Sequence, residues 1–176
     1  LQYTWLRSLM NRHKNFWQIT EDSLDKSMKA FKINNSMKNE LLNLYKILST
    51  FPEVNNVLKK LKQKNFKLVI LSNGTPDLLN ELVKSNNLEK IFDDIFSIET
   101  VGVYKPDSKV YDIPIKKYLI QKNEAAYLSA NTWDVCGAGN YGFNSVWVNR
   151  SNSIFDNLDY VPKYQIENLS KLIDIV

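Results

Sequence analysis

Apolar residues recur at helical spacing through the first fifty residues. One predicted helix carries Tyr3 and Met10 on the same face, a second is expected to be capped by Thr20, and a third begins near Ser36. No segment in this part of the chain has the pattern of a strand. We therefore expect residues 1–50 to form a helical cap subdomain.

From residue 51 onward, apolar runs alternate with segments of helical periodicity. The continuous apolar run FKLVIL (66–71) suits a strand that is buried on both faces. Thr75-Pro76-Asp77 is typical of a helix start, because a hydroxyl can cap the helix and proline fits its first position. The predicted elements are, in order, a helix over 54–61, the strand 66–71, the helix after Thr75, a strand near 95–98, a helix after Lys105-Pro106, a strand at 126–129, a helix from Trp133, a strand at 145–148 and a last helix near 166–173.

Strands that are separated by helices imply a parallel sheet with helices packed on it. The sequence therefore predicts an α/β protein, in which residues 51–176 form a Rossmann-like core beside the helical cap at 1–50. In sheets of this kind ligands bind at the carboxyl ends of the strands, so the candidate site should be sought there.

The size and composition are those of an ordinary globular domain. The 176 residues can bury one good core, and 44% of them are apolar while 24% are charged. No window approaches eighteen uncharged apolar residues, and residues 1–14 lack the pattern of a secretory signal. A single cysteine, Cys136, is compatible with a reducing compartment, so we expect a cytoplasmic protein and no membrane partner.

The net charge of +4 raises the question of nucleic-acid binding. Only three of the 23 basic residues are arginines, and the lysines are scattered, whereas nucleic-acid surfaces favour arginine with interleaved aromatic residues. The densest group of lysines, between Lys59 and Lys67, ends an amphipathic helix and is expected to be a solvated face. We therefore expect no nucleic-acid partner.

A literal G-x-G-x-x-G pattern is formed by Gly137, Gly139 and Gly142. A dinucleotide-binding fingerprint needs these glycines in the turn between a strand and a full helix. Here only two residues separate Gly142 from the next predicted strand, so there is no room for that helix. The glycines should instead lie in and at the end of the helix from Trp133, with Gly142 as a left-handed stop.

Short polar side chains follow the predicted strands. They comprise two hydroxyls, two amides, one ammonium and one carboxylate: Ser72, Ser129, Asn73, Asn131, Lys105 and Asp134. Each could instead be a turn residue or a helix cap. A lysine and an aspartate that converge with four short hydrogen-bonding side chains nevertheless favour a catalytic site.

The other reactive residue types are scarce. One histidine, His13, and one cysteine are too few for a protein-built zinc site, so no metal site is predicted. No acid lies at a spacing from His13 that suggests a dyad, and we expect it to be a solvated helix residue. Cys136 is expected to serve in packing.

Four segments together resemble one known family. They are LQYTWLRSLMNRHKNFWQITEDSL (1–24), LSNGTP (71–76), VGVYKPDSKVY (101–111) and LSANTWDVCGAGNYGFNSVWVNR (128–150). In this order they resemble the L-2-haloacid dehalogenases (type II) of the haloacid dehalogenase-like hydrolases. The resemblance covers nearly the whole chain, and the N-S-x-W-[VI]-N-R ending is specific to this subgroup.

The resemblance implies a reaction and a set of roles. In that family an aspartate displaces halide from C2 of an L-2-haloacid, and water then hydrolyses the ester, without metal or organic cofactor. By resemblance Ser72 would bind the substrate carboxylate, Asn73 would help to hold the leaving halide, and Lys105 would neutralise the nucleophile. Tyr111, Ser129, Asn131 and Asp134 would order the water and the lysine, while Trp133 and Phe16 would supply apolar walls. The partner would be a small 2-haloacid, and the resemblance also implies a homodimer through the helical part.

The pattern that carries the family's nucleophile, Asp-x-x-Gly-Thr, does not occur in residues 1–176. We therefore expect the chain to be a fragment or a truncated product that is inactive alone. Two alternatives stay open, a degenerate or binding-only relative and a Mg²⁺-dependent phosphatase of the same superfamily. Asn131 stands where a phosphatase would need a metal-binding carboxylate, which disfavours the phosphatase. Halide release distinguishes the dehalogenase from both alternatives.

Pro114 departs from the expected pattern. It falls inside the helix that follows Lys105-Pro106 and removes a backbone hydrogen bond to Val110, at a cost of about 3 kcal/mol in an unkinked helix. We therefore expect the chain to bend at Pro114, and either the helix breaks there or this lineage has relaxed. Tyr111 lies three residues earlier, so its position depends on the outcome.

Overall fold

Two separate parallel sheets organise the chain, one in each of two compact units. The computed structural model describes all 176 residues. The first unit comprises Leu1–Thr50 and Val69–Tyr104, and the second comprises Phe51–Leu68 and Lys105–Val176. The residues within each unit contact one another more than they contact the other unit. The division into a cap at residues 1–50 and a core at 51–176 stays a prediction. None of the helices is long and apolar enough to cross a membrane.

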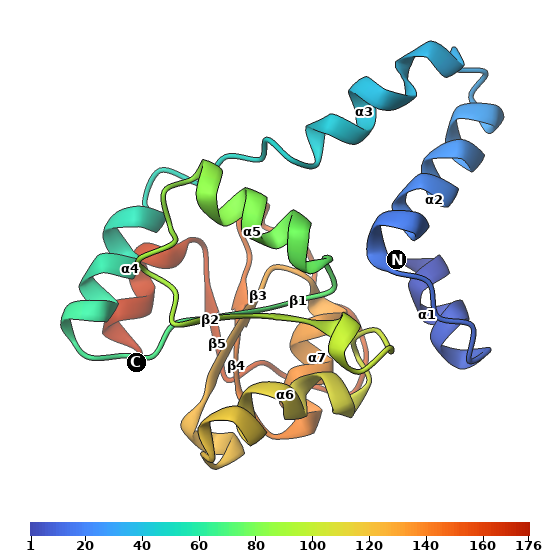
Figure 1. Ribbon diagram of the computed structural model, residues 1–176. Helices are drawn as coiled ribbons and strands as arrows, with labels where there is room; N and C mark the ends of the chain where they lie inside the picture. The colour runs from blue at the N-terminus through green and yellow to red at the C-terminus, as the bar shows by residue number, and fades with distance from the viewer. The chain divides into compact units, whose positions relative to one another are not determined.

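The first unit begins with helices and ends with a two-stranded sheet. Its elements are α1 (Gln2–Leu9), α2 (Phe16–Ala30), η1 (Asn35–Met37), α3 (Lys38–Leu44), β1 (Val69–Ser72), α5 (Pro76–Ser85), β2 (Asp94–Ser97) and η2 (Ile98–Thr100). Strands β1 and β2 run parallel, and their last residues, Ser72 and Ser97, are partners in the register. Helix α5 connects them and packs on β2 (Figure 1). As predicted, residues 1–50 contain no strand.

The start of α2 differs from the prediction. The Asn15 side chain accepts a hydrogen bond from the Gln18 backbone at 2.9 Å, and the Gln18 side chain accepts one from the Asn15 backbone at 3.2 Å. This capping box places the helix N-cap at Asn15, five residues before the expected cap at Thr20. Thr20 is therefore not a cap. It is buried inside the helix, and its hydroxyl donates to the Phe16 carbonyl oxygen at 2.8 Å.

Strand β1 is shorter and more exposed than the run FKLVIL suggested. The prediction of a strand over 66–71 was wrong at its start, because the first residues of this run belong to the turn that ends α4 (Val54–Gln63). Asn65 adopts a left-handed conformation, and the Phe66 backbone donates to the Leu61 carbonyl oxygen at 3.1 Å. The strand begins only at Val69, pairs with β2 alone and is half-buried along its length.

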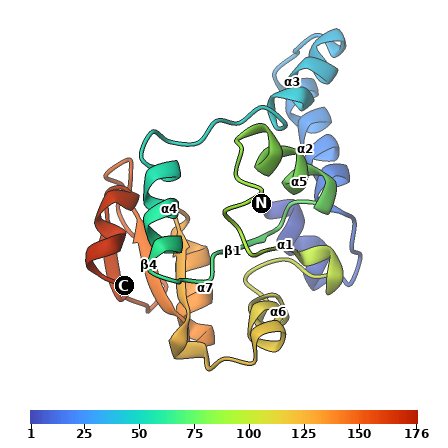
Figure 2. The ribbon, with the colours of Figure 1, turned by 60° about the vertical axis from the view of Figure 1, so that its left-hand side comes forward.

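The second unit carries a three-stranded parallel sheet in the order β3-β4-β5. Its elements are α4, α6 (Ser108–Tyr118), η3 (Lys122–Glu124), β3 (Ala126–Ser129), α7 (Thr132–Tyr141), β4 (Asn144–Val148), β5 (Tyr164–Ile166) and η4 (Leu169–Asp174). Helix α7 packs on β3 and β4, and α4 lies beside η4 (Figure 2). The core includes Val135, Ala138 and Val146, which are fully buried. These parallel strands and their connecting helices confirm the predicted α/β class.

The last predicted helix, near 166–173, is present only in part, as a 3-10 helix over Leu169–Asp174. Residues 166–173 do not form an α-helix, because the chain first adds a short parallel strand, β5, to the edge of β4. The Asn149 backbone donates to the Ile166 carbonyl oxygen at 2.8 Å and extends this pairing. The Asn168 side chain then accepts from the Ser170 backbone and starts the 3-10 helix η4. A three-residue strand is too short to show an alternating pattern.

Helix α6 continues through Pro114 and ends only at Leu119, which is left-handed. The helix therefore does not break at Pro114, and the expected bend stays a prediction. Val110 and Tyr111 are fully buried and Pro114 is buried as well, so the packing of this face holds the helix together.

Candidate active site

Four polar side chains from four segments meet in the interior of the second unit. They are Lys105, which precedes α6, Tyr111 on α6, Tyr127 on β3 and Asp134 in the first turn of α7. We call this group the lysine cluster. Lys105 and Asp134 are only 6% and 5% exposed, and Tyr111 is fully buried. Charged residues are rarely buried to this degree unless they are paired.

Asp134 is the common acceptor of the lysine cluster. Its Oδ1 accepts from the Tyr111 hydroxyl at 2.9 Å, and its Oδ2 lies 3.5 Å from Lys105 Nζ. The Tyr127 hydroxyl is 3.0 Å from both carboxylate oxygens and accepts from Lys105 Nζ at 2.5 Å. The cluster is thus one connected network in which every member touches Asp134.

Burial and charge act in opposite directions on Lys105. Burial lowers the pKa of the Lys105 ammonium, and the neighbouring Asp134 carboxylate raises it. Burial, and then the charge of Asp134, raise the pKa of both the Tyr111 and the Tyr127 hydroxyl. Both tyrosines therefore keep their protons at neutral pH and serve as donors to the carboxylate.

Gly137 in α7 allows the close approach of Tyr111. A Cβ atom at Gly137 would lie 2.6 Å from both the Tyr111 hydroxyl oxygen and Pro106 Cβ. Gly142 follows the last residue of the helix in a left-handed conformation, with φ of 116°. The expectation that the G-x-G-x-x-G residues lie in and at the end of this helix is confirmed. They serve packing and termination.

The remaining predicted residues of the second unit lie around the start of α7. The Asn131 backbone donates to Ser129 Oγ at 3.2 Å, and the Asn131 carbonyl oxygen accepts from the backbone of Asp134 at 3.1 Å. Ser129 is half-buried at the end of β3, whereas Asn131 is exposed. Trp133 is half-buried in the first turn of the helix. This turn joins the carboxyl end of β3 directly to the residue that carries the carboxylate.

Ser72, Asn73 and Phe16 belong to the first unit. Ser72 ends β1, and its Oγ accepts from the Gly74 backbone at 3.1 Å. The buried Ser97 at the end of β2 donates to the Gly74 carbonyl oxygen at 2.6 Å. These two bonds fix the turn that presents Ser72 and Asn73 after the strand.

The segment before α2 is held by an acid that is distant in sequence. The Phe16 backbone donates to Glu99 Oε1 at 3.2 Å, and His13 Nε2 lies 2.8 Å from Glu99 Oε2. His13 precedes α2 in a loop, so its expected place in a helix is wrong. Glu99 is 86 residues away, and no local spacing could have indicated this pair.

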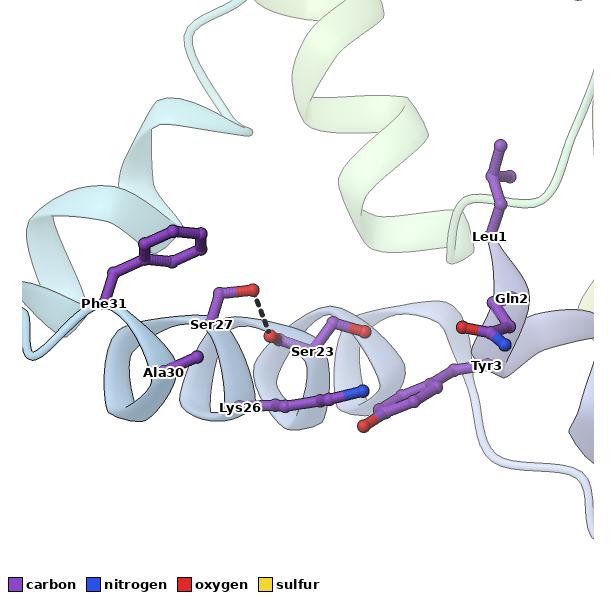
Figure 3. A pocket seen from close by; sticks show the side chains of 8 residues that line it. All are labelled: Leu1, Gln2, Tyr3, Ser23, Lys26, Ser27, Ala30 and Phe31. Carbon is purple, nitrogen blue, oxygen red and sulfur yellow. Dashed lines mark hydrogen bonds between the residues drawn. The ribbon is translucent and has the colours of Figure 1, made fainter.

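Two open hollows occur in the first unit. One, of about 290 Å³, follows α2 between the start of α1 and Phe31 (Figure 3). The other, of about 420 Å³, is lined by residues that include Trp17, Thr75 and Glu99. Neither is lined by a member of the lysine cluster, so these hollows do not indicate a substrate pocket there.

Tyr127 is the member of the lysine cluster that the sequence analysis missed. It lies two residues before Ser129 in β3, and alternate residues of a strand point to the same face. That spacing was the available signal. It does not reveal by itself that the hydroxyl reaches both Lys105 and Asp134.

No three His, Cys, Asp or Glu side chains are grouped as metal ligands. The prediction of a metal-free site stays a prediction. Within the lysine cluster, each oxygen of Asp134 accepts from a lysine or tyrosine donor, an arrangement that suits the holding of an ammonium group.

Comparison with known proteins identifies the relatives of this chain. Residues 6–148 match the family model described as haloacid dehalogenase-like hydrolase. The chain is 35% identical to an (S)-2-haloacid dehalogenase of Pseudomonas sp. (strain YL), a match that covers 99% of this chain and 76% of that protein. It is 33% identical to (S)-2-haloacid dehalogenase 4A of Burkholderia cepacia, over 98% of this chain and 75% of that protein.

The solved structures that resemble this chain are also dehalogenases. A dehalogenase crystal structure superimposes with a TM-score of 0.96 at 32% identity and covers 99% of this chain and 78% of its own. The L-2-haloacid dehalogenase of Xanthobacter autotrophicus, with chloropropionic acid covalently bound, matches with a TM-score of 0.92 at 26% identity. That match covers 99% of this chain and 80% of the other.

Proposed function

Because the chain belongs to the haloacid dehalogenase-like hydrolases, and within them to the (S)-2-haloacid dehalogenases, we propose that it serves the hydrolysis of short L-2-haloacids to D-2-hydroxyacids. The observation that carries the proposal is the lysine cluster. It holds a buried ammonium group next to a carboxylate and two hydroxyls.

The proposed reaction has two steps. An aspartate oxygen attacks C2 of the substrate from the side opposite the halogen, the carbon–halogen bond breaks, and halide leaves with the bonding electrons. Water then attacks the ester carbonyl carbon, which releases the 2-hydroxyacid and restores the aspartate. Attack from the opposite side inverts C2, so an L substrate gives a D product.

In this proposal the lysine cluster supplies the positive charge that the reaction needs. Lys105 neutralises the attacking carboxylate, and Asp134 keeps Lys105 charged despite its burial. Tyr111 orients Asp134 through its 2.9 Å hydrogen bond. Ser129 and Asn131, at the carboxyl end of β3, are proposed to order the hydrolytic water.

The remaining assignments concern the substrate. We propose that Ser72 binds its carboxylate, that Asn73 helps to hold the departing halide, and that Trp133 and Phe16 supply apolar walls. A dry wall matters because a carboxylate that is stripped of water is a better nucleophile towards carbon.

The chain lacks the sequence pattern that carries the nucleophile in this family. Residues 1–176 contain no Asp-x-x-Gly-Thr pattern, and they span 76% of the length of the Pseudomonas relative. We infer that these residues alone do not release halide. The reaction is therefore tested with the protein as its gene encodes it.

The first prediction concerns halide release from (S)-2-chloropropionate. Lys105→Met should lower kcat about 1,000-fold, because a charge pair at about 4 Å with an effective dielectric near 20 contributes about 4 kcal/mol. Lys109→Met is the matched control, because Lys109 is exposed in α6, the helix that Lys105 precedes, and it should leave the rate unchanged. Equal rates for Lys105→Met and the parent protein would refute the assigned role.

Three further readouts separate the alternatives. In a single turnover in H₂¹⁸O, an ester intermediate places the label in the protein carboxylate rather than in the first product. Binding of the haloacid without halide release would support the binding-only relative. Mg²⁺-dependent release of phosphate from an aryl phosphate would support the phosphatase instead.

We also infer that the protein is a homodimer that pairs through the helical residues 1–50, and that it works in the cytoplasm. The support for the dimer is the exposed apolar surface of this part, which includes Leu9, Met10 and Phe31.

A further inference from the structure

The hydroxyl of Tyr127 lies between the two charged groups of the lysine cluster. It is 2.5 Å from Lys105 Nζ and 3.0 Å from each oxygen of Asp134, whereas the ammonium and the carboxylate are 3.5 Å apart. The hydrogen bonds through Tyr127 are therefore shorter than the direct one. An ammonium group can only donate and a carboxylate can only accept, so a hydroxyl is suited to join them.

The ring of Tyr127 is held by its neighbours. It stacks on Phe143 with the centroids 5.6 Å apart and an interplanar angle of 2°. It also meets Tyr111 edge to face at 5.5 Å, and Lys105 Nζ lies 5.2 Å from its centroid. These contacts involve the ring rather than the hydroxyl, so a phenylalanine can keep them.

We propose that Tyr127 is a positioning residue, whose hydroxyl accepts from the Lys105 ammonium and donates to the Asp134 carboxylate, and so fixes the distance between them. We call this pair of hydrogen bonds the Tyr127 bridge. The effect of the bridge on turnover rests on the proposed function, whereas the bridge itself rests on the geometry alone. Tyr127 acts through Lys105 and is not assigned a contact with the substrate.

The bridge should keep Lys105 charged. The titratable groups that face the ammonium include Tyr127 from β3 and Asp134 from α7, and Tyr111 of α6 acts on it through Asp134. Tyr127→Phe removes an acceptor from the ammonium and a donor from the carboxylate. Since burial already lowers the pKa of Lys105, loss of the bridge should lower it further.

The direction of the pH effect follows from the role of Lys105. Only the charged ammonium neutralises the nucleophile, so activity is lost as the pH rises through the pKa of Lys105. Tyr127→Phe should therefore move the alkaline limb of the kcat profile down by about one pH unit, the equivalent of a hydrogen bond to a charged group. The KM measured well below that limb should change little.

The experiment compares Tyr127→Phe with the parent protein in two ways. The first is the pH profile of halide release. The second is the pKa of Lys105, followed in protein labelled with [¹³Cε]lysine and identified by the signal that Lys105→Arg removes. Tyr141→Phe is the matched control, because the Tyr141 ring also lies beside Tyr111 and Phe143 but its hydroxyl donates to Asp112 instead. The control should leave both readouts unchanged.

The outcomes are distinguishable. If the parent protein releases no halide but its Lys105 pKa falls in Tyr127→Phe, the proposed function fails and the bridge stands. If halide is released and neither the alkaline limb nor the Lys105 pKa moves in Tyr127→Phe, the bridge is overturned. Should Tyr127→Phe not fold, replacement of Tyr127 by 3-fluorotyrosine gives the same test, because a more acidic hydroxyl accepts more weakly from Lys105 and should lower its pKa.

Discussion

At the scale of single residues, Asp134 links the lysine cluster. Donors from three segments, Lys105, Tyr111 and Tyr127, all reach its two oxygens. A carboxylate that gathers so many donors offsets the burial of the lysine, since a buried charge without compensation is far more costly than a buried pair.

Replacement of Asp134 should therefore destabilise the protein strongly. Asp134→Asn removes the charge that offsets the burial of Lys105, and the free energy of unfolding should fall by about 3–5 kcal/mol at neutral pH. The pKa of Lys105 in the folded variant should drop well below its unfolded value. The unfolded state then binds more protons, so stability should recover as the pH rises and Lys105 becomes neutral.

Urea unfolding followed from pH 7 to pH 10 measures this effect. Asp174→Asn is the control, because Asp174 is exposed in η4 and its replacement should cost little at any pH. A deficit in Asp134→Asn that stays constant over this range would contradict the coupling to Lys105.

The sequence predicted part of this residue-level picture. Lys105, Tyr111 and Asp134 were selected by resemblance, and the structure brings these three together. Tyr127 was missed because an aromatic residue in a strand is indistinguishable from core packing until its hydroxyl is placed. Such contacts depend on which distant chain segments meet in the fold, and a local sequence pattern carries no information about that.

At the scale of elements, the strongest local signals located their elements best. The predicted strand 126–129 is β3, and the Thr75-Pro76 start of α5 is confirmed, with Thr75 accepting from the Leu78 backbone at 3.5 Å. Two elements were misplaced, for different reasons. The start of β1 depends on the local backbone bond that ends α4, whereas β5 exists because it pairs with β4, which is distant in the sequence.

One ion pair joins elements of the second unit that are far apart in the sequence. Arg150, after β4, donates to Glu53 at 2.6 Å, and the Leu169 backbone donates to the same oxygen at 3.2 Å. The guanidinium carbon of Arg150 lies 3.8 Å from the centroid of Phe51. Burial tends to raise the pKa of Glu53, but the bonds from Arg150 and the backbone outweigh it and leave the pKa lowered.

Glu53→Gln should remove about 1 kcal/mol from the free energy of unfolding at neutral pH. Because the folded pKa of Glu53 is lowered, its contribution is complete above the unfolded pKa and is lost as the pH falls through the folded value. The gap between variant and parent should therefore close in acid. Denaturant unfolding at pH 7 and at pH 3 measures it, with the exposed Glu89→Gln as the control. A gap that widens in acid would contradict this account.

At the scale of the whole molecule, apolar exposure is uneven along the chain. Most of the exposed large apolar side chains lie within residues 1–50: Leu1, Leu6, Leu9, Met10, Phe31, Ile33, Met37, Leu44, Tyr45, Ile47 and Leu48. Exposed apolar side chains that form a large patch mark interaction sites in proteins, and this part of the chain is where such a patch would be sought. The basic residues give no comparable signal, since lysines such as Lys59, Lys60 and Lys64 are simply exposed on and after α4.

The proposed homodimer should accordingly depend on the helices of the first unit. Leu9 and Phe31 are 80% and 79% exposed, and glutamates at both positions would place charges in an interface that should otherwise be apolar. Multi-angle light scattering should give twice the chain mass for the parent protein and the single mass for Leu9→Glu/Phe31→Glu. Ile154→Glu is the control, because Ile154 is 95% exposed in the second unit and should leave the dimer intact. A dimer that survives the double substitution but dissociates on Ile154→Glu would place the interface on the second unit instead.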